Sequence, residues 1–170
     1  MVGGARVDTF LALGSNLGDR AATIEGAIEF LARAGEVAGK SPLYETAPVG
    51  ITDQPAFINA VIRLRTSLGP ERLFVYAKSV EAAFGRRPGV RYGPRPLDID
   101  LLIYGDLHIH TTRLDVPHPH LAERAFVLIP LRDIAPEVVL PGPGATVREL
   151  AARVDGRSVT PWESARAAIA

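Results

Sequence analysis

The sequence predicts an α+β fold in which helices pack on a mostly antiparallel sheet. Two segments carry apolar residues at helical spacing, and four others have the apolar runs or two-residue alternation of strands. They follow one another in the order β-α-β-β-α-β, with one long stretch rich in glycine, proline and arginine at 85–96. This order is that of a ferredoxin-like split βαβ core, with its helices on one face of the sheet.

The first part of the chain supplies a strand, a helix and a second strand. Residues 7–13 form an apolar run that ends in a turn at 14–19, which is typical of a buried strand. From Asp19 to Gly35 the apolar residues recur at helical spacing, at Ile24, Ala27, Ile28 and Leu31. A further strand is expected at about 37–46.

The remaining core elements follow in the same way. In a strand at about 56–66, one face is aliphatic, whereas the other carries Phe57, Asn59 and arginines. A helix begins at Gly69-Pro70, because proline suits a first helical position, and a strand at about 97–104 completes the core. A hairpin-like stretch and short helices near 121–124 and 147–154 come next. Residues 1–170 are expected to form one domain, in which the tail at 156–170 receives no assignment.

The composition excludes several functions. Nineteen basic residues balance nineteen acidic ones, so no overall field attracts nucleic acid or a membrane surface. The absence of cysteine excludes disulfides, thiolate zinc sites and cysteine nucleophiles. No apolar run reaches the roughly 18 residues of a membrane span, and no signal-peptide pattern opens the chain. We therefore expect a cytoplasmic protein without nucleic-acid or membrane partners.

Two aspartates on the last core strand are candidate metal ligands. Asp98 and Asp100 alternate with apolar residues, so on a strand they face the same side, with Cα atoms about 7 Å apart. Carboxylate oxygens suit Mg²⁺, which usually completes its coordination shell with water and substrate phosphates. A solvated, merely acidic strand face is the alternative, and for an isolated Asp-x-Asp it is the commoner one.

The loop before this strand favours a metal site over a merely acidic strand face. Residues 85–96 place Arg86, Arg87, Arg91 and Arg95 directly ahead of the aspartates. Arginine forks match phosphate oxygens, so cations beside metal-binding carboxylates predict a site for a polyphosphate with its Mg²⁺. The glycines and prolines suggest a loop that closes over a nucleotide. The chain contains no P-loop motif.

Other candidate side chains have weaker patterns. His108, His110, His118 and His120 lie within thirteen residues, but their spacing matches no standard zinc motif. We expect His118 to reach a phosphate or ribose and the other three to lie on the surface. Phe57 and Asn59 lie on the 56–66 strand, and Phe126 follows the short helix at 121–124. The two aromatic rings could stack on a heterocycle and the amide could bind its edge, or all three side chains could simply pack in the core.

Four segments, taken together, resemble the 6-hydroxymethyl-7,8-dihydropterin pyrophosphokinases of folate biosynthesis. The resemblance runs in order from about residue 8 to residue 140, and the third segment is the most specific. The segments are Leu11-Ala12-Leu13-Gly14-Ser15-Asn16-Leu17-Gly18, Tyr44-Glu45-Thr46-Ala47-Pro48-Val49-Gly50 continuing through Asp53 to Ala60, Gly93-Pro94-Arg95-Pro96-Leu97-Asp98-Ile99-Asp100, and Val116-Pro117-His118-Pro119 continuing through Glu123 to Val127.

The resemblance implies an enzyme that transfers pyrophosphate from ATP to the pterin hydroxymethyl group and releases AMP. It implies two Mg²⁺ ions held by Asp98 and Asp100, with Arg86 and Arg91 acting with them in catalysis. The implied pterin contacts are Thr46, Pro48, Val49, Phe57, Asn59 and Phe126. The implied ATP contacts are Glu81, Arg95, Ile99, Arg113, His118 and Arg124. A monomer or weak homodimer is expected.

The chain departs from the family pattern at several positions. Ala47 stands where proline is common, and Lys78 stands where glutamine is frequent, which leaves one ATP contact open. The arginine loop varies in length across the family, so the register of Arg86, Arg87 and Arg91 is open, and Tyr92 receives no role.

Two other functions remain open from the sequence. A different Mg²⁺-dependent phosphotransferase or nucleotidyltransferase would use the same acidic pair with another acceptor. A ferredoxin-like RNA-binding module would need exposed aromatics and a basic surface, and the zero net charge argues against it.

Overall fold

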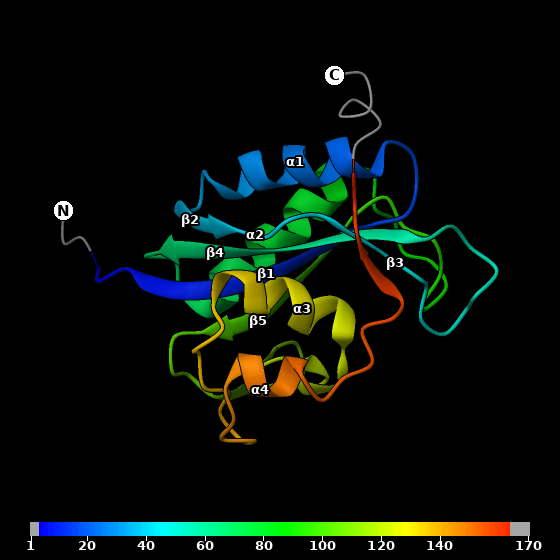
Figure 1. Ribbon diagram of the computed structural model, residues 1–170. Helices are drawn as coiled ribbons and strands as arrows, with labels where there is room; N and C mark the ends of the chain where they lie inside the picture. Colours follow the sequence, from blue (N-terminus) through cyan, green and yellow to red (C-terminus); the bar gives the residue numbers. More distant parts are fainter. Residues whose placement is uncertain (1–3, 164–170) are drawn as a thin grey trace, which may run out of the picture.

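A six-stranded antiparallel sheet forms the centre of the computed structural model, which describes residues 4–163 (Figure 1). The elements of the first half are β1 (Val7–Ser15), α1 (Arg20–Leu31), β2 (Glu36–Lys40), β3 (Tyr44–Thr46), β4 (Phe57–Thr66) and α2 (Pro70–Ala83). Those of the second half are β5 (Asp98–Tyr104), β6 (Ile109–His110), β7 (Asp115–Val116), the 3₁₀ turn η1 (Leu121–Glu123), α3 (Ala125–Ile134), α4 (Val147–Ala151) and β8 (Val159–Pro161).

The strand order confirms the predicted split βαβ core. The sheet runs β5-β1-β4-β3-β8, and β2 pairs with β4 beside β3. In the centre, Leu13 of β1 lies opposite Ala60 of β4 on one side and Ile99 of β5 on the other. Because β5 is an edge strand, one of its two backbone edges is free of strand partners.

The two crossover helices begin as the sequence predicts. Asp19 caps α1 by accepting a hydrogen bond from the backbone N–H of Ala22 (3.1 Å), which satisfies a donor that the first helical turn leaves unpaired. Pro70 occupies the first turn of α2, where its missing N–H costs no helical hydrogen bond. Both helices pack their apolar residues on the sheet face that carries Leu11, Ile62 and Ile99.

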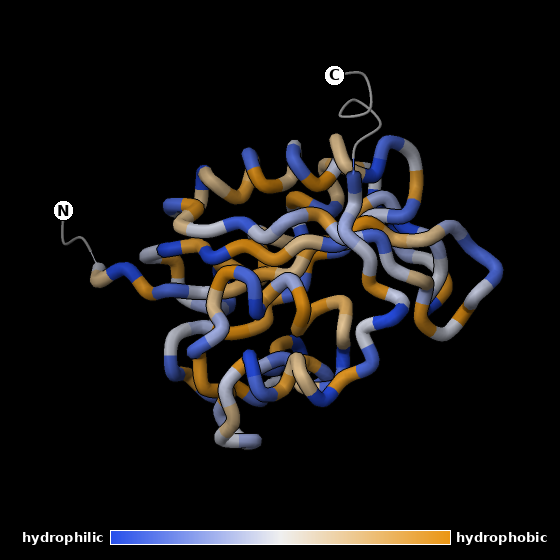
Figure 2. Tube along the Cα trace, viewed as in Figure 1, coloured by the Kyte–Doolittle hydropathy of each residue, from blue (hydrophilic) through white to orange (hydrophobic). Residues whose placement is uncertain are grey.

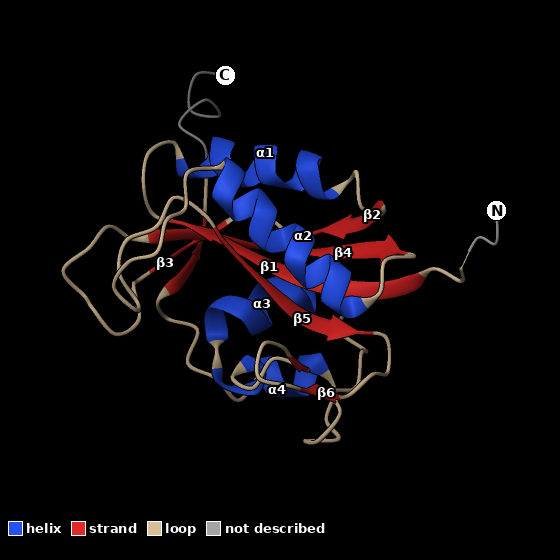
Figure 3. Cartoon of the chain, turned by 180° about the vertical axis from the view of Figure 1, so that it is seen from behind, coloured by secondary structure: helices blue, strands red, loops and turns tan. Residues whose placement is uncertain are grey.

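The two helices of the split βαβ core lie on one face, as predicted, and the later helices α3 and α4 cover the other face. A second core on the opposite face contains Phe10 and Val61 of the sheet together with Leu128 and Leu131 of α3. In Figures 1 and 3, α1 lies on one side of the sheet, and α3 and α4 lie on the other. Figure 2 shows hydrophobic segments concentrated in the central strands between these layers. The sheet is therefore covered on both faces.

The helix α3 was missed because its sequence contains Pro130, which normally interrupts a helix. The expected short helices at 121–124 and 147–154 correspond to η1 and α4. Part of the unassigned tail forms β8, which pairs with β3, whereas residues 164–170 lie outside the described part of the chain. Within residues 4–163 no helix is long and apolar enough to cross a membrane.

The expected strand at 37–46 is divided into β2 and β3 at Ser41 and Pro42. The N–H of Ser41 still donates to the carbonyl of Val61 (2.9 Å), but the Ser41 hydroxyl takes the place of a backbone acceptor for the N–H of Val61 (3.0 Å). Pro42 has no N–H with which to continue the ladder.

Candidate active site

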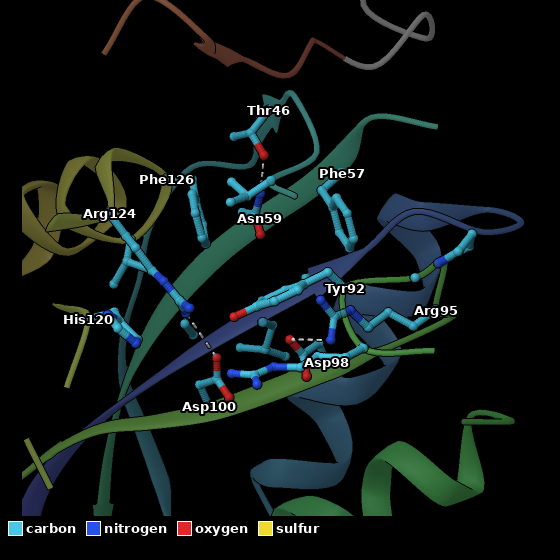
Figure 4. A pocket seen from close by; sticks show the side chains of 18 of the residues that line it. Thr46, Phe57, Asn59, Tyr92, Arg95, Asp98, Asp100, His120, Arg124 and Phe126 are labelled. Atoms are coloured by element: carbon cyan, nitrogen blue, oxygen red, sulfur yellow. Dashed lines mark hydrogen bonds and ion pairs between the residues drawn. The ribbon is translucent and has the colours of Figure 1, made fainter. Parts of the chain in front are cut away.

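A cavity of about 530 Å³ opens on the α3 face of the sheet, and β5 places both predicted aspartates on its wall. Asp98 and Asp100 face the cavity, whereas Leu97, Ile99 and Leu101 are buried in the core on the other face. The alternation expected for this strand is therefore present. Figure 4 shows the two carboxylates side by side at the base of the cavity.

Cationic side chains surround the carboxylates. The guanidinium of Arg86 lies 2.5 Å from Oδ1 of Asp98, and that of Arg95 lies 3.5 Å from Oδ2 of the same residue. On the other side, Oδ2 of Asp100 is 3.9 Å from Nε2 of His118 and 4.0 Å from Nη1 of Arg124. The site thus alternates cations with carboxylates, as a polyphosphate with its metal ions requires.

The two neighbouring carboxylates, Asp98 and Asp100, repel each other. Burial, and next the neighbouring carboxylate of Asp98, raises the pKa of Asp100 above its ordinary value. Burial lowers the pKa of His118, which favours the neutral imidazole. A cation bound between the aspartates would relieve the repulsion that raises the Asp100 pKa.

The donor set at this point fits Mg²⁺. Among the described residues, no group of three or more histidine, cysteine or acidic side chains is placed to hold a metal. Asp98 and Asp100 offer two carboxylates with room in the cavity for water and phosphate oxygens, which is the arrangement that Mg²⁺ commonly uses.

The free edge of β5 is hydrogen-bonded by side chains from α2 and the loop after it. The N–H of Ile99 donates to Oε1 of Glu81 (2.7 Å), and its carbonyl accepts from Nζ of Lys78 (2.8 Å). Nη1 of Arg86 donates to the carbonyl of Leu97 (3.2 Å). These contacts fix the strand segment that carries the aspartates against α2.

The arginine loop is anchored through Asn16 at the end of β1. The buried Asn16 accepts from the N–H of Arg95 (2.8 Å) and donates from Nδ2 to Oε1 of Gln54 (2.9 Å) and to the carbonyl of Pro55 (3.0 Å). Gln54 in turn donates to the carbonyl of Tyr92 (2.7 Å). The two loops beside the cavity, 47–56 and 85–96, are thereby tied to one another.

The other end of the cavity is aromatic. Phe57, Phe126, Thr46 and Val49 line it, together with Asn59, whose Nδ2 donates to Oγ1 of Thr46 (2.5 Å). Figure 4 shows the amide oxygen of Asn59 turned away from Thr46, and the side chain of Tyr92 extending between this end and the aspartates. A flat heterocycle would find stacking surfaces and a hydrogen-bond acceptor here.

Twelve of the predicted site residues line this cavity. They are Thr46, Val49, Phe57, Asn59, Arg86, Arg91, Arg95, Asp98, Asp100, His118, Arg124 and Phe126. Pro48, Glu81, Ile99 and Arg113 are not on its wall: Glu81 and Ile99 are buried in the contacts behind β5, and Arg113 lies exposed between β6 and β7. Their ATP and pterin contacts remain predictions.

Several lining residues had no assigned role. Lys78 lies one helical turn before Glu81 on α2, so their spacing of three could have indicated it. His120, expected on the surface, reaches the rim, and Gly14 lines the wall where a side chain would meet Asn59. Tyr92 has a φ of 62°, which is uncommon for a residue other than glycine.

The fold and this site define an α+β domain whose cavity has one end lined by cations and carboxylates and another end lined by aromatic side chains. The profile of the family described as "7,8-dihydro-6-hydroxymethylpterin-pyrophosphokinase (HPPK)" matches residues 10–136. The chain belongs to this family, which confirms the resemblance drawn from the four sequence segments.

Similar proteins agree with this membership. A 2-amino-4-hydroxy-6-hydroxymethyldihydropteridine pyrophosphokinase of Methylorubrum extorquens is 46% identical over 148 residues, which cover 86% of this chain and 92% of the relative. The protein of the same name from Bacillus subtilis is 42% identical over 131 residues, covering 76% and 78%. The mitochondrial folate synthesis bifunctional protein of Arabidopsis thaliana is 43% identical over 92% of this chain, which spans only 26% of that protein.

Solved structures share the fold at low sequence identity. The Plasmodium falciparum HPPK-DHPS wild type with pteroate has a TM-score of 0.70 and 18% identity, covering 87% of this chain and 42% of that one. A crystal structure of HPPK-DHPS in complex with substrates has a TM-score of 0.72 at 16% identity, covering 87% and 43%. The predicted α+β class is confirmed.

Proposed function

We propose that the chain transfers pyrophosphate from ATP to the hydroxymethyl group of 6-hydroxymethyl-7,8-dihydropterin, a step of folate synthesis. The observation that carries the proposal is a single cavity in which a cationic and acidic end adjoins an aromatic end with an amide. The first end suits a magnesium-bound triphosphate, and the second suits a bicyclic pterin. The names of the full-length bacterial relatives support the same reaction.

In this reaction the hydroxymethyl oxygen attacks the β-phosphorus of ATP. A new C–O–P bond forms, the bond between the β-phosphorus and the oxygen bridging to the α-phosphate breaks, and AMP leaves. The proton of the hydroxyl passes to solvent or to a phosphate oxygen. Phosphoryl transfers depend chiefly on positioning and charge neutralisation, so the site does not need a dedicated base.

Different residues of the cavity would bind the metal, the triphosphate and the pterin. Asp98 and Asp100 would hold Mg²⁺, and when bound the metal would neutralise and orient the triphosphate. Arg86, Arg91 and Arg95 would match phosphate oxygens with their forks, and neutral His118 would donate or accept a hydrogen bond at the nucleotide. Asn59, Phe57 and Phe126 would orient the pterin so that its hydroxymethyl group faces the phosphates.

One assay tests this function directly. The protein is incubated with MgATP and the reduced hydroxymethylpterin, and the nucleotide products are separated. We expect AMP and the pterin diphosphate in equal amounts, with no product when EDTA is added. ADP as the product, or turnover without the pterin, would contradict the proposal.

A binding measurement separates this function from a phosphotransferase with another acceptor. A pterin analogue should bind strongly when an unreactive ATP analogue and Mg²⁺ are present. The absence of such binding would favour the other acceptor.

A further inference from the structure

One guanidinium joins the two ends of the loop at 47–56, whose flanking residues line the aromatic end of the cavity. Arg20, the first residue of α1, donates from Nη1 to the carbonyl of Ala56 (2.7 Å), where the loop ends. Its Nη2 lies 2.8 Å from Oε2 of Glu45, which immediately precedes Thr46 on β3. The planar fork of arginine allows one side chain to bind both loop ends at once.

The end of the described chain holds this guanidinium in place. β8 pairs with β3, with Thr46 opposite Val159, and the N–H of Trp162 donates to the carbonyl of Leu43 (2.8 Å). The Trp162 ring then lies under Arg20, whose Cζ is 5.0 Å from the ring centroid. This cation–π contact packs the guanidinium against the ring, and the Arg20 side chain is only 21% exposed.

The loop itself has little else to set its shape. Most of its residues are exposed, and the hydrogen bonds that tie it to Asn16 and to the neighbouring loop come from its last residues, Gln54 and Pro55. Yet Thr46 before the loop, Ala47 and Val49 within it, and Phe57 after it all face the cavity. Thr46 lies opposite Phe57 in the last pair of the β3–β4 ladder, and the bridge from Glu45 to Ala56 holds that pair together beside Asn59.

The position of Arg20 is unfavourable for the helix that carries it. A positive charge at the first residue of α1 faces the positive end of the helix dipole, where acidic residues are preferred. Helix stability therefore does not account for an arginine here, whereas its contacts with Glu45 and Ala56 do.

We infer that Arg20, seated on Trp162, is a positioning residue that holds the Thr46–Phe57 end of the β3–β4 ladder, and with it the pterin end of the cavity, in place. This inference rests on the proposed function and adds the element that shapes its acceptor subsite. Arg20 is not among the residues that line the cavity, so it acts through Thr46 and Phe57, which are.

The test compares pterin and ATP parameters in full-length variants. In Arg20→Gln both contacts of the fork are lost, so we expect the KM for the pterin to rise by about tenfold while the KM for ATP changes less than about twofold. Arg20→Lys keeps the charge but bridges only one loop end, so its defect should be intermediate. Trp162→Leu should shift the pterin KM in the same direction.

Matched controls separate positioning from stability. Lys40→Gln removes another ion pair of the same helix, between Lys40 and Glu25 (2.8 Å), and should leave both KM values unchanged. In the double variant Arg20→Gln with Glu45→Gln, the effects on pterin KM should be less than additive, because the two residues act through one contact. Thermal melting should show that all variants are folded at the assay temperature.

Two results would overturn the inference. If the wild type turns over the pterin but Arg20→Gln has an unchanged pterin KM, or raises both KM values equally, the positioning role is wrong and the proposed function stands. If the wild type neither binds nor turns over the pterin, the proposed function and this inference fail together.

Discussion

The amide of Asn59 is oriented by Thr46. Nδ2 of Asn59 donates to Oγ1 of Thr46 over 2.5 Å on the neighbouring strand, which leaves Oδ1 as an acceptor at the aromatic end of the cavity. Asn59 is buried and lies opposite Gly14 in the β1–β4 register. The glycine leaves the space that the amide occupies, so three strand residues together define this acceptor.

Gly14→Ala should therefore impair pterin binding without unfolding the protein. A Cβ at position 14 would lie 2.8 Å from Oδ1 of Asn59, and the flexible amide would have to turn away. Loss of one oriented hydrogen bond predicts a pterin Kd weaker by about tenfold, which calorimetry with an unreactive ATP analogue would measure. Gly69→Ala is the control, because nothing lies within 4 Å of its added Cβ. Equal pterin affinity in both variants would contradict the role of Asn59.

Asp98→Ala and Asp100→Ala should each nearly abolish turnover, by at least about 100-fold, because each removes a proposed metal ligand and a charge that holds the surrounding cations. Circular dichroism should show that the fold survives, since both side chains lie on the cavity wall and not in the core. Asp106→Ala, at an exposed turn beyond β5, is the matched control. Full activity in either cavity variant would exclude the metal role.

Asp100→Asn should stabilise the metal-free protein at neutral pH. The folded-state pKa of Asp100 is raised, first by burial and then by Asp98, so its ionised form is disfavoured in the folded protein. Below the ordinary aspartate pKa the carboxyl of Asp100 is protonated in both the folded and the unfolded protein, and it does not lower the free energy of unfolding. As the pH rises from there through the raised folded-state pKa, the free energy of unfolding falls, because the unfolded protein loses this proton more readily.

The measurement is thermal melting in EDTA. The gain in Tm on Asp100→Asn should be present at pH 7 and shrink as pH falls toward about 4, the ordinary aspartate pKa. Asp106→Asn, at the exposed turn beyond β5, is the matched control variant. A lower Tm for Asp100→Asn at pH 7 would mean that the attraction of His118, Lys78 and Arg124 outweighs burial and repulsion.

The sheet and the acidic pair follow from local patterns that tertiary contacts do not alter. The alternation in β5 places Asp98 and Asp100 on one face whatever packs behind them, and the two-faced pattern of β4 places Asn59 and Phe57 on the cavity side. The order in which the strands pair then follows from the order of helices and strands along the chain, because few sheet topologies are compatible with a split βαβ arrangement.

What could not be predicted depends on long-range contacts. Helix α3 could not be predicted because it contains Pro130, a residue that normally interrupts a helix. This helix nevertheless lines the cavity, with Arg124 and Phe126 at its start. The roles of Asn16 and Arg20 depend on loops brought together from distant parts of the chain, with separations of 79 and 36 residues for Asn16–Arg95 and Arg20–Ala56. No local pattern encodes such contacts. Glu81 likewise lies outside the four motif segments, and its hydrogen bond with the N–H of Ile99 joins α2 to β5 across 18 residues.

Arg91 differs from Arg86 and Arg95 in what it contacts. Arg86 and Arg95 already hold the carboxylate of Asp98, whereas the guanidinium of Arg91 lies over Tyr92, 5.0 Å from the ring centroid, on the cavity wall. It is exposed, so its charge can reach a phosphate without first breaking an internal ion pair with Asp98. Its proposed contribution is to the charge that develops on the transferred group.

Arg91→Ala should consequently reduce kcat by about 100-fold and change the pterin Kd by less than about threefold, because the lost contact is made to phosphate in the transition state. Single-turnover rates and calorimetric pterin binding would measure the two quantities separately. Arg72→Ala, which removes an exposed arginine from α2 away from the cavity, should change neither. A variant that binds the pterin poorly but, once saturated, reacts at the wild-type rate would place Arg91 at the acceptor instead of the triphosphate.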